Sequence, residues 1–145
     1  MDLEIKINIV SSSQKGEVEY RLMLDNKVVG YLRMKQTNLI LTLGTDVWRL
    51  MDNDIMTREQ IMSKKNINSI DYIVVPEHLR RQGYASTLMA YIMNQYNDEI
   101  YMYVEPNGID YDVLIQFYNQ YNFRVLCEWS NYGNEKRSIM YRPKL

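Results

Sequence analysis

The sequence predicts an α/β (α+β) fold with a mixed, mostly antiparallel central sheet and helices on both faces. Apolar and polar residues alternate through residues 3–43, with turn residues between the runs, and this pattern is typical of antiparallel strands. Residues 83–96 and 113–121 instead place apolar residues at helical spacing. Short strand-like runs separate and follow these two helices. A length of 145 residues suits one domain, and we expect residues 1–145 to form it.

The first part of the chain is expected to form four antiparallel strands. They are predicted at residues 3–9, 18–24, 28–34 and 39–43. Asp25-Asn26 supplies turn chemistry for a hairpin between the second strand and the third. Thr37-Asn38 supplies another turn, after which the fourth strand continues the antiparallel meander.

A polar segment with near-helical spacing follows at residues 45–65, and Thr57-Arg58-Glu59-Gln60 has the composition of a helix start. Residues 70–75 are rich in β-branched residues and predict a short strand. Pro76 ends this strand because proline has no backbone donor. The helix expected at residues 83–96 has apolar residues every four positions, so we expect one of its faces to pack on the sheet.

The last part of the chain is expected to form a strand, a helix and two closing strands. Residues 100–104 are apolar on both faces, as expected of an interior strand that is covered on both sides. Asp110 or Asp112 is expected to cap the next helix, and Asn122 to end it in a left-handed conformation. The closing strands are predicted at residues 123–129 and 138–141.

Composition argues against several classes of function. The chain has 17 Lys and Arg against 18 Asp and Glu, so its net charge of -1 disfavours nucleic acid as a partner. No apolar window approaches the roughly 18 residues of a spanning helix, so no membrane partner is expected. The start has no secretory pattern, and the expected location is cytoplasmic. The single cysteine, Cys127, fits that reducing compartment; it is expected to be a buried hydrophobic residue, and no metal site is predicted.

The most informative part of the sequence is the strand-to-helix segment at residues 75–85. The first N–H groups of such a helix have no helical partner and lie at the positive end of its dipole, which makes a ready site for phosphate. Gly83 allows close approach of a ligand, and Arg80 and Arg81 add charge that can reach phosphate oxygens. The pattern predicts a polyphosphate ligand. A glycine that merely begins a helix is the alternative.

One motif of this segment reads Arg80-x-x-Gly83-x-Ala85 behind Val75-Pro76-Glu77. A second motif reads Phe117-Tyr118-Asn119-Gln120-Tyr121-Asn122-Phe123. Together they resemble the GNAT superfamily of N-acetyltransferases, which has an acetyl-CoA-binding Arg/Gln-x-x-Gly-x-Gly/Ala motif and a later helix ending in Phe-Tyr-x-x-x-Gly-Phe. Asn122 replaces the glycine, and asparagine also tolerates positive φ. The resemblance covers residues 70–141 and, before them, only the antiparallel strands.

The resemblance implies acetyl-CoA as the cosubstrate. It also implies a GNAT-like sheet whose middle strands, at residues 70–75 and 100–104, splay apart around the pantetheine arm. Backbone groups of residues 73–75 are then expected to bond the pantetheine amides, and the amides of residues 81–85 to hold the pyrophosphate. The expected cofactor-binding residues are Ile73, Val74, Val75, Arg80, Arg81, Gln82, Gly83, Tyr84, Ala85 and Ser86.

The activity implied by the resemblance is acetyl transfer to a primary amine by direct attack in a ternary complex. Such an attack needs a general base for the amine and a general acid for the leaving thiolate. Tyr118 matches the family tyrosine near the cofactor sulfur and is the expected acid, with a core aromatic role as the alternative. Asp71 is the first candidate for the base, and Glu77, His78 and ordered water are the alternatives.

The acceptor side departs from the family pattern. Family members commonly place two helices between the first and second strands, whereas residues 10–17 are too few for two helices. The insert at residues 44–66 is expected to take their place as an adaptable apolar surface, or simply to pack on the sheet. Many members have a cofactor-contacting Asn where this chain has Tyr111, and Asn107 is expected to form a turn.

Two classes of function stay open at this point. The first is an N-acetyltransferase whose acceptor is an amine of a small molecule or a protein, acting alone or as a homodimer. The second is a catalytically inactive GNAT-fold protein with a binding or inhibitory role, encoded by a phage. Binding of acetyl-CoA with and without turnover separates the two.

Overall fold

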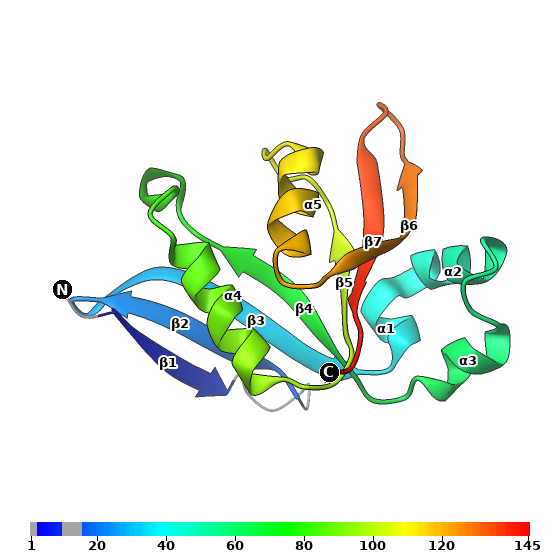
Figure 1. Ribbon diagram of the computed structural model, residues 1–145, viewed down its shortest axis with the longest axis horizontal. Helices are drawn as coiled ribbons and strands as arrows, with labels where there is room; N and C mark the ends of the chain where they lie inside the picture. The colour runs from blue at the N-terminus through cyan, green and yellow to red at the C-terminus, as the bar shows by residue number, and fades with distance from the viewer. Residues whose placement is uncertain (1–2, 10–15) are drawn as a thin grey trace. The chain divides into compact units, whose positions relative to one another are not determined.

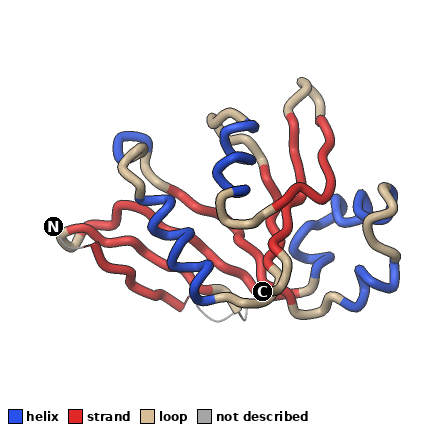
Figure 2. Tube along the Cα trace, in the orientation of Figure 1, coloured by secondary structure: helices blue, strands red, loops and turns tan. Residues whose placement is uncertain are grey.

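The structure, a computed structural model, describes residues 3–9 and 16–145 of the chain (Figure 1). Its helices and strands follow one another as shown in Figure 2. In chain order the elements are β1 (Leu3–Ile9), β2 (Val18–Leu24), β3 (Lys27–Thr37), α1 (Leu39–Leu43), η1 (Gly44–Val47), α2 (Trp48–Asp52), α3 (Arg58–Ser63), β4 (Ile67–Val74), η2 (Glu77–Leu79), α4 (Tyr84–Gln95), β5 (Ile100–Val104), α5 (Tyr111–Asn119), β6 (Arg124–Ser130) and β7 (Lys136–Arg142).

The chain forms two compact units, each assembled from two separate stretches of sequence. The first unit is Met1–Gln36 with Ile70–Asn97, and the second is Thr37–Ser69 with Asp98–Leu145. The first unit therefore contains β1, β2, almost all of β3, the end of β4, η2 and α4. The second contains the remaining helices and strands.

The strands are hydrogen-bonded in the order β1-β2-β3-β4-β5-β7-β6. Antiparallel pairs predominate, while β4 and β5 pair in parallel at Asn68↔Ile100 and Ser69↔Tyr101, within the second unit. This mixed, mostly antiparallel sheet with its helices confirms the predicted fold class. The expected splay of residues 70–75 from residues 100–104 concerns two different units and stays a prediction.

In the first unit, α4 packs on one face of the antiparallel strands. Tyr20 on β2 faces this helix, because its ring centre lies 5.6 Å from that of Tyr91 and its hydroxyl oxygen 2.7 Å from that of Tyr96. The helix begins at Tyr84 and ends at Gln95, so the prediction of a sheet-packed helix over residues 83–96 is confirmed.

Gly30 on β3 permits a close approach in the same unit. A Cβ at this position would lie 3.2 Å from Val75 Cγ2 and 3.3 Å from Leu88 Cδ1. Both distances are tighter than ordinary van der Waals contact. The absence of a side chain at Gly30 therefore lets the end of β4 and the helix α4 pack against β3.

The opposite face of these strands has a network of ion pairs. Glu19 on β2 is buried and accepts hydrogen bonds from Arg21 Nε at 2.7 Å and Arg33 Nη2 at 3.2 Å. The Arg33 guanidinium carbon also lies 5.0 Å from the centre of the Tyr72 ring. The hydrogen bond from Arg21, together with Arg33, holds the pKa of Glu19 below its ordinary value, although desolvation acts in the other direction. The network links β2, β3 and β4.

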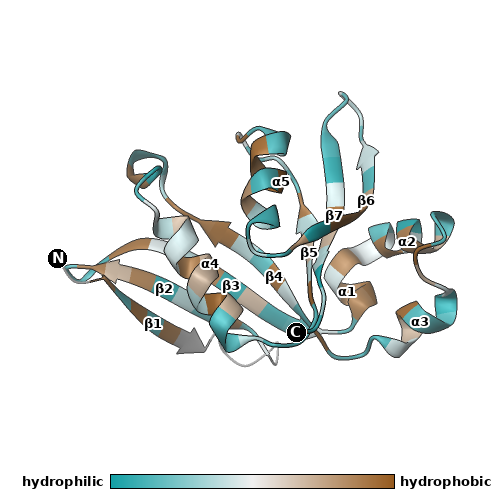
Figure 3. Cartoon of the chain, viewed as in Figure 1, coloured by the Kyte–Doolittle hydropathy of each residue, from teal (hydrophilic) through white to brown (hydrophobic). Residues whose placement is uncertain are grey.

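In the second unit, the helical insert packs on the sheet. α1 is almost wholly hydrophobic (Figure 3). The buried core of this unit joins helix and sheet residues, namely Leu39, Leu43, Val47, Leu50, Ile61, Ile67, Tyr101, Cys127 and Ile139. The alternative interpretation of residues 44–66, a segment packed on the sheet, is therefore confirmed. Cys127 is buried as predicted, and burial raises the pKa of its thiol.

The strand predicted at residues 39–43 is wrong, because these residues form the helix α1. Asn38 has an extended backbone, and its Oδ1 accepts a hydrogen bond from the Leu41 N–H at 2.8 Å, which caps a helix start. Leu39 and Leu43, four residues apart, both face the core. Asn38, which was expected to form a turn before a further strand, therefore caps a helix instead.

Other predicted element starts and ends are confirmed by their caps. Thr57 and Gln60 form a reciprocal capping box at the start of α3. Asp110 caps α5 by accepting hydrogen bonds from the Asp112 and Val113 N–H groups. Asn122 has a φ of 68°, so it ends the helical region in the predicted left-handed conformation.

Part of the predicted connection at residues 10–17 lies outside the described residues, which begin again at residue 16. Within the described ranges, no helix is both long enough and apolar enough to span a membrane.

Candidate functional site: the loop before α4

The loop between β4 and α4 is compact and hydrogen-bonded. After Pro76 it forms the single turn η2, in which the Leu79 N–H donates to the Pro76 carbonyl at 2.8 Å. The Arg80 N–H donates to the Glu77 carbonyl at 3.2 Å. These bonds turn the chain after β4, and residues 80–83 then lead into the start of α4.

Two residues of this loop have left-handed backbone conformations. Arg81 has a φ of 66° and Gly83 a φ of 80°. A left-handed conformation is easy for glycine but unusual for arginine. Gly83 directly precedes the right-handed first turn of α4, and such a succession of left-handed and right-handed residues turns backbone N–H groups toward one side, which forms a concavity for anions.

The start of α4 is open and electropositive. Gly83 is the N-cap and has no side chain to cap the helix, and the first turn contains no acidic residue. The N–H groups of Tyr84 and Ala85, like those at any helix start, have no helical acceptor. A Cβ built on Gly83 would meet no atom within 4 Å. Gly83 is therefore needed for its φ and not for a close approach of protein atoms, and the helix start beside it is open.

Side chains of the loop support this geometry. Arg80 Nε donates to the Val75 carbonyl at 3.1 Å, which ties the guanidinium to the end of β4. The Tyr84 side chain is buried, and its hydroxyl donates to Gln82 Oε1 at 3.1 Å. Arg81 is exposed. The predicted cofactor-binding residues from Arg80 to Ser86 thus form one continuous segment at one helix start, in the first unit.

The predicted strand residues and base candidates belong to the same unit. Residues 73–75 are half-buried at the end of β4, where the Val75 carbonyl is already the acceptor for Arg80. Asp71 lies on β4 and is exposed. Glu77 and His78 lie on η2 and are exposed as well. Exposure leaves all three side chains accessible to a ligand.

Tyr118 belongs to the second unit, on α5. It is 6% exposed, and its ring contacts those of Phe117 and Phe123, with centres 5.3 Å and 6.2 Å away. Burial raises the pKa of Tyr118 to about 12. Its hydroxyl is therefore protonated at neutral pH and is able to donate a hydrogen bond or a proton.

Tyr111 occupies the position at which many GNAT proteins have a cofactor-contacting asparagine. Its side chain is buried, and its hydroxyl donates to Glu128 Oε2 at 2.7 Å. This bond ties the first turn of α5 to β6. The chain bends at residues 107–109, where a turn was predicted, and Gly108 has a φ of 79°. The Tyr111 hydroxyl has a protein partner.

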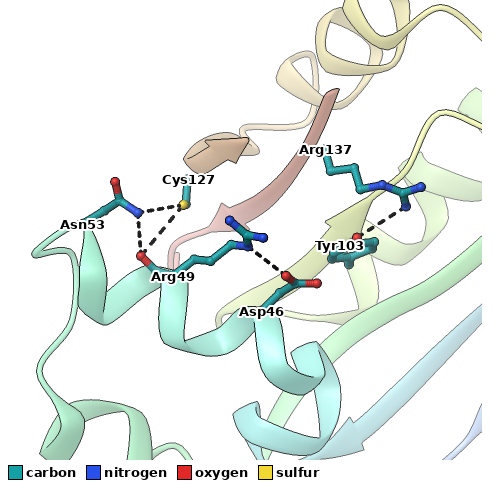
Figure 4. Close-up of polar contacts among 6 residues, drawn as sticks. All are labelled: Asp46, Arg49, Asn53, Tyr103, Cys127 and Arg137. Carbon is teal, nitrogen blue, oxygen red and sulfur yellow. Dashed lines mark hydrogen bonds and ion pairs between the residues drawn. The ribbon is translucent and has the colours of Figure 1, made fainter. Parts of the chain in front are cut away.

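Sequence reasoning missed a polar cluster in the second unit. Figure 4 shows Arg49 with Asp46 on the insert, and Tyr103 with Arg137 on the sheet. The Arg49 guanidinium also lies over the ring of Trp129 on β6. Because these residues are far apart in the sequence, no local spacing pattern could have brought them together.

Comparison with known proteins identifies the family. The model of the acetyltransferase (GNAT) family matches residues 14–123, which is more than half of the chain. The chain therefore belongs to the GNAT acetyltransferase family, as its two motifs indicate. None of the curated proteins matches its sequence.

Solved structures show the same fold. The ribosomal-protein-S18-alanine N-acetyltransferase of Escherichia coli has a TM-score of 0.62 at 13% identity, over 91% of this chain and 72% of that one. A GNAT family acetyltransferase of Streptococcus pneumoniae has a TM-score of 0.60 at 11% identity, over 90% and 68%. A GNAT family acetyltransferase of Elizabethkingia anophelis, solved with acetyl-CoA bound, has a TM-score of 0.61 at 10% identity, over 99% and 98%.

Proposed function

We propose that this chain is an acetyl-CoA-dependent N-acetyltransferase that moves an acetyl group to a primary amine of a small molecule or a protein. The observation that supports it best is the open start of α4, where left-handed Arg81 and Gly83 precede unpaired helix N–H groups. Membership of the GNAT family supports the acetyl chemistry. The similar fold of the Elizabethkingia anophelis protein, solved with acetyl-CoA, supports the cosubstrate.

In this proposal the loop before α4 holds the pyrophosphate of acetyl-CoA. The N–H groups of residues 81–85 donate to its oxygens, and the Arg80 and Arg81 guanidinium groups balance its charge. Backbone groups of residues 73–75 bond the pantetheine amides. The bound cosubstrate supplies the activated acetyl thioester.

The transfer is a direct attack in a ternary complex. The acceptor nitrogen forms the amide bond while the carbon–sulfur bond of the thioester breaks, so the nitrogen loses a proton and the sulfur gains one. We assign the proton donor to Tyr118, whose hydroxyl is protonated at neutral pH. We assign the base to Asp71, which is exposed on β4 two residues before Ile73. The chain works in the cytoplasm, as a single domain of residues 1–145.

The test is acetyl-CoA binding by calorimetry, with Gly83→Glu as the variant. This change adds a side chain and a negative charge at an open, left-handed position, so acetyl-CoA affinity should fall by at least about 100-fold. Gly133→Glu is the matched control, because Gly133 also has a positive φ and open space around its Cβ position. The control should bind acetyl-CoA normally.

Unchanged binding by the Gly83→Glu protein would show that the phosphate site lies elsewhere. Absence of acetyl-CoA binding by the unmodified protein would overturn the proposed function. Binding without turnover of any amine would instead favour the inactive, binding or inhibitory, GNAT-fold protein.

A further inference from the structure

The strand β1 lies at one end of the strand order, so it forms an edge of the sheet (Figure 1). Within residues 3–9 and 16–145, β2 is its one hydrogen-bonded neighbour, and the two strands pair antiparallel along the whole of β1. The side of β1 that faces away from β2 therefore presents backbone N–H and C=O groups that no described strand pairs. Such an edge is a template for a further strand.

Apolar side chains on β1 are exposed beside this edge. Leu3 is 46% exposed and Ile7 57%, and Ile5 between them is half-buried. Ile7 is paired directly with Tyr20 of β2, so these three side chains lie on the face of the sheet on which α4 packs. Tyr20 is only 6% exposed, so the helix covers β2 but leaves the apolar stripe on β1 accessible. An accessible apolar stripe along an open edge is typical of an interaction site.

The sequence of β1 is complementary to itself in the antiparallel orientation. Leu3-Glu4-Ile5-Lys6-Ile7 reads apolar, acidic, apolar, basic, apolar. A two-fold axis at Ile5 therefore places the two copies of Ile5 opposite each other, each Leu3 opposite an Ile7 and each Glu4 opposite a Lys6. Apolar residues then meet apolar ones and opposite charges meet across the strands, which are the favourable cross-strand pairs.

Other antiparallel registers of two β1 strands are worse. A shift of one residue places charged side chains opposite apolar ones. A shift of two residues places Lys6 opposite Lys6 or Glu4 opposite Glu4, and like charges directly opposite each other are destabilising. The charges of this strand therefore select one register and one partner, which is a second copy of the chain.

We propose that β1 is the interface of a homodimer in which the two β1 strands pair antiparallel about a two-fold axis at Ile5. Each copy then covers the apolar stripe of the other. Glu4 and Lys6 are each 57% exposed and lie 3.6 Å apart within one chain, a contact that contributes little, so both can pair across the interface. Both copies use the same patch, so the assembly closes at two chains.

This interface is small and lies apart from the loop before α4. A pair of short strands buries less than the roughly 1,200 Å² of a standard interface, so we expect a Kd of about 10–100 µM. The chain is then mainly monomeric at about 1 µM and mainly dimeric at about 500 µM. β2 and β3 separate β1 from β4 in the sheet, so dimerisation should leave acetyl-CoA affinity unchanged.

Charge reversal tests the register. Sedimentation equilibrium between about 1 and 500 µM should show a monomer–dimer equilibrium for the unmodified chain. Glu4→Lys places lysines opposite each other, and Lys6→Glu does the same with glutamates, so each change should raise Kd by at least about tenfold. An equimolar mixture of the two variants should dimerise as the unmodified chain does, because every lysine of one variant then lies opposite a glutamate of the other.

Two kinds of control accompany these variants. The doubly reversed chain, Glu4→Lys with Lys6→Glu, should dimerise normally, because it restores both opposite-charge pairs. Glu59→Lys and Lys65→Glu make the same changes of net charge at exposed positions of the second unit, and both should leave Kd unchanged. Far-ultraviolet circular dichroism shows that each variant is folded, which is expected because all four positions are exposed.

The outcomes bear on the interface and not on the proposed function. A chain that stays monomeric up to 500 µM would overturn the dimer. Single variants that dimerise as the unmodified chain does, or a mixture of them that stays monomeric, would overturn this interface and register. Calorimetry with acetyl-CoA tests the proposed function separately, whatever the oligomeric state.

Discussion

Tyr118 is a buried tyrosine whose hydroxyl is protonated at neutral pH. Burial raises its pKa to about 12, so the phenol stays neutral across the working range of most enzymes. The rings of Phe117 and Phe123 hold its ring in place. The hydroxyl can therefore be removed without disturbing the packing of the ring, which makes a clean test of its role.

Tyr118→Phe should lower kcat by roughly 100-fold, the usual contribution of a positioned general acid, while acetyl-CoA affinity stays within about twofold of the unmodified protein. Steady-state kinetics and calorimetry measure the two quantities. Tyr121→Phe is the control, because Tyr121 follows the same helix and packs on the same Phe117 ring. A normal kcat for Tyr118→Phe would remove this tyrosine from the acid role and leave it a core aromatic.

At the scale of elements, the ion network of Glu19 joins three neighbouring strands of the first unit. Glu19→Gln should destabilise the protein by about 1–3 kcal/mol at pH 7, because Arg21 and Arg33 lose a charged acceptor. The lowered pKa of Glu19 fixes the pH dependence. Its contribution is complete above the unfolded-state value of about 4.3 and is lost as the pH falls through the lower folded-state pKa.

Urea unfolding at a series of pH values tests this prediction. The stability difference between the two proteins should be largest near neutral pH and should shrink below about pH 4. Glu4→Gln is the control, since its pair with Lys6 is exposed and should contribute nothing measurable. A stability difference that is the same at pH 3 and pH 7 would contradict an ionised, paired Glu19.

Most elements could be predicted because their signals are local. Alternation predicts β2 at its observed bounds, and the capping residues Thr57 and Asp110 locate α3 and α5. The strand prediction for residues 39–43 failed because a short, mostly apolar run of five residues fits a buried strand and a buried helix turn equally well. The Asn38 cap and the core contacts of Leu39 and Leu43 decide for the helix.

The same distinction applies to the candidate site. The loop before α4 could be predicted because its arginines, Gly83 and the helix start are contiguous in sequence. The contacts of Glu19 with Arg33, and of Arg49 with Trp129, could not, because they depend on strand register and on how the insert packs. Sequence patterns indicate which face of an element is buried, but not which polar side chains meet across elements.

At the scale of the whole molecule, the proposal that residues 1–145 act as one domain predicts cooperative unfolding of the two compact units. Trp48 and Trp129 both belong to the second unit, so tryptophan fluorescence follows that unit alone. Far-ultraviolet circular dichroism follows the helices and strands of both units. If the chain is one domain, the two signals should change at the same temperature.

Acetyl-CoA extends this test, because its proposed phosphate site lies in the first unit and both reporter tryptophans lie in the second. At 100 times its Kd, acetyl-CoA should stabilise the native state by about 2.7 kcal/mol. That corresponds to a rise of roughly 8 °C in Tm for a chain of this size, and it should appear equally in both signals. Two separate transitions, or a shift in circular dichroism that leaves the tryptophan midpoint unchanged, would show that the units unfold independently.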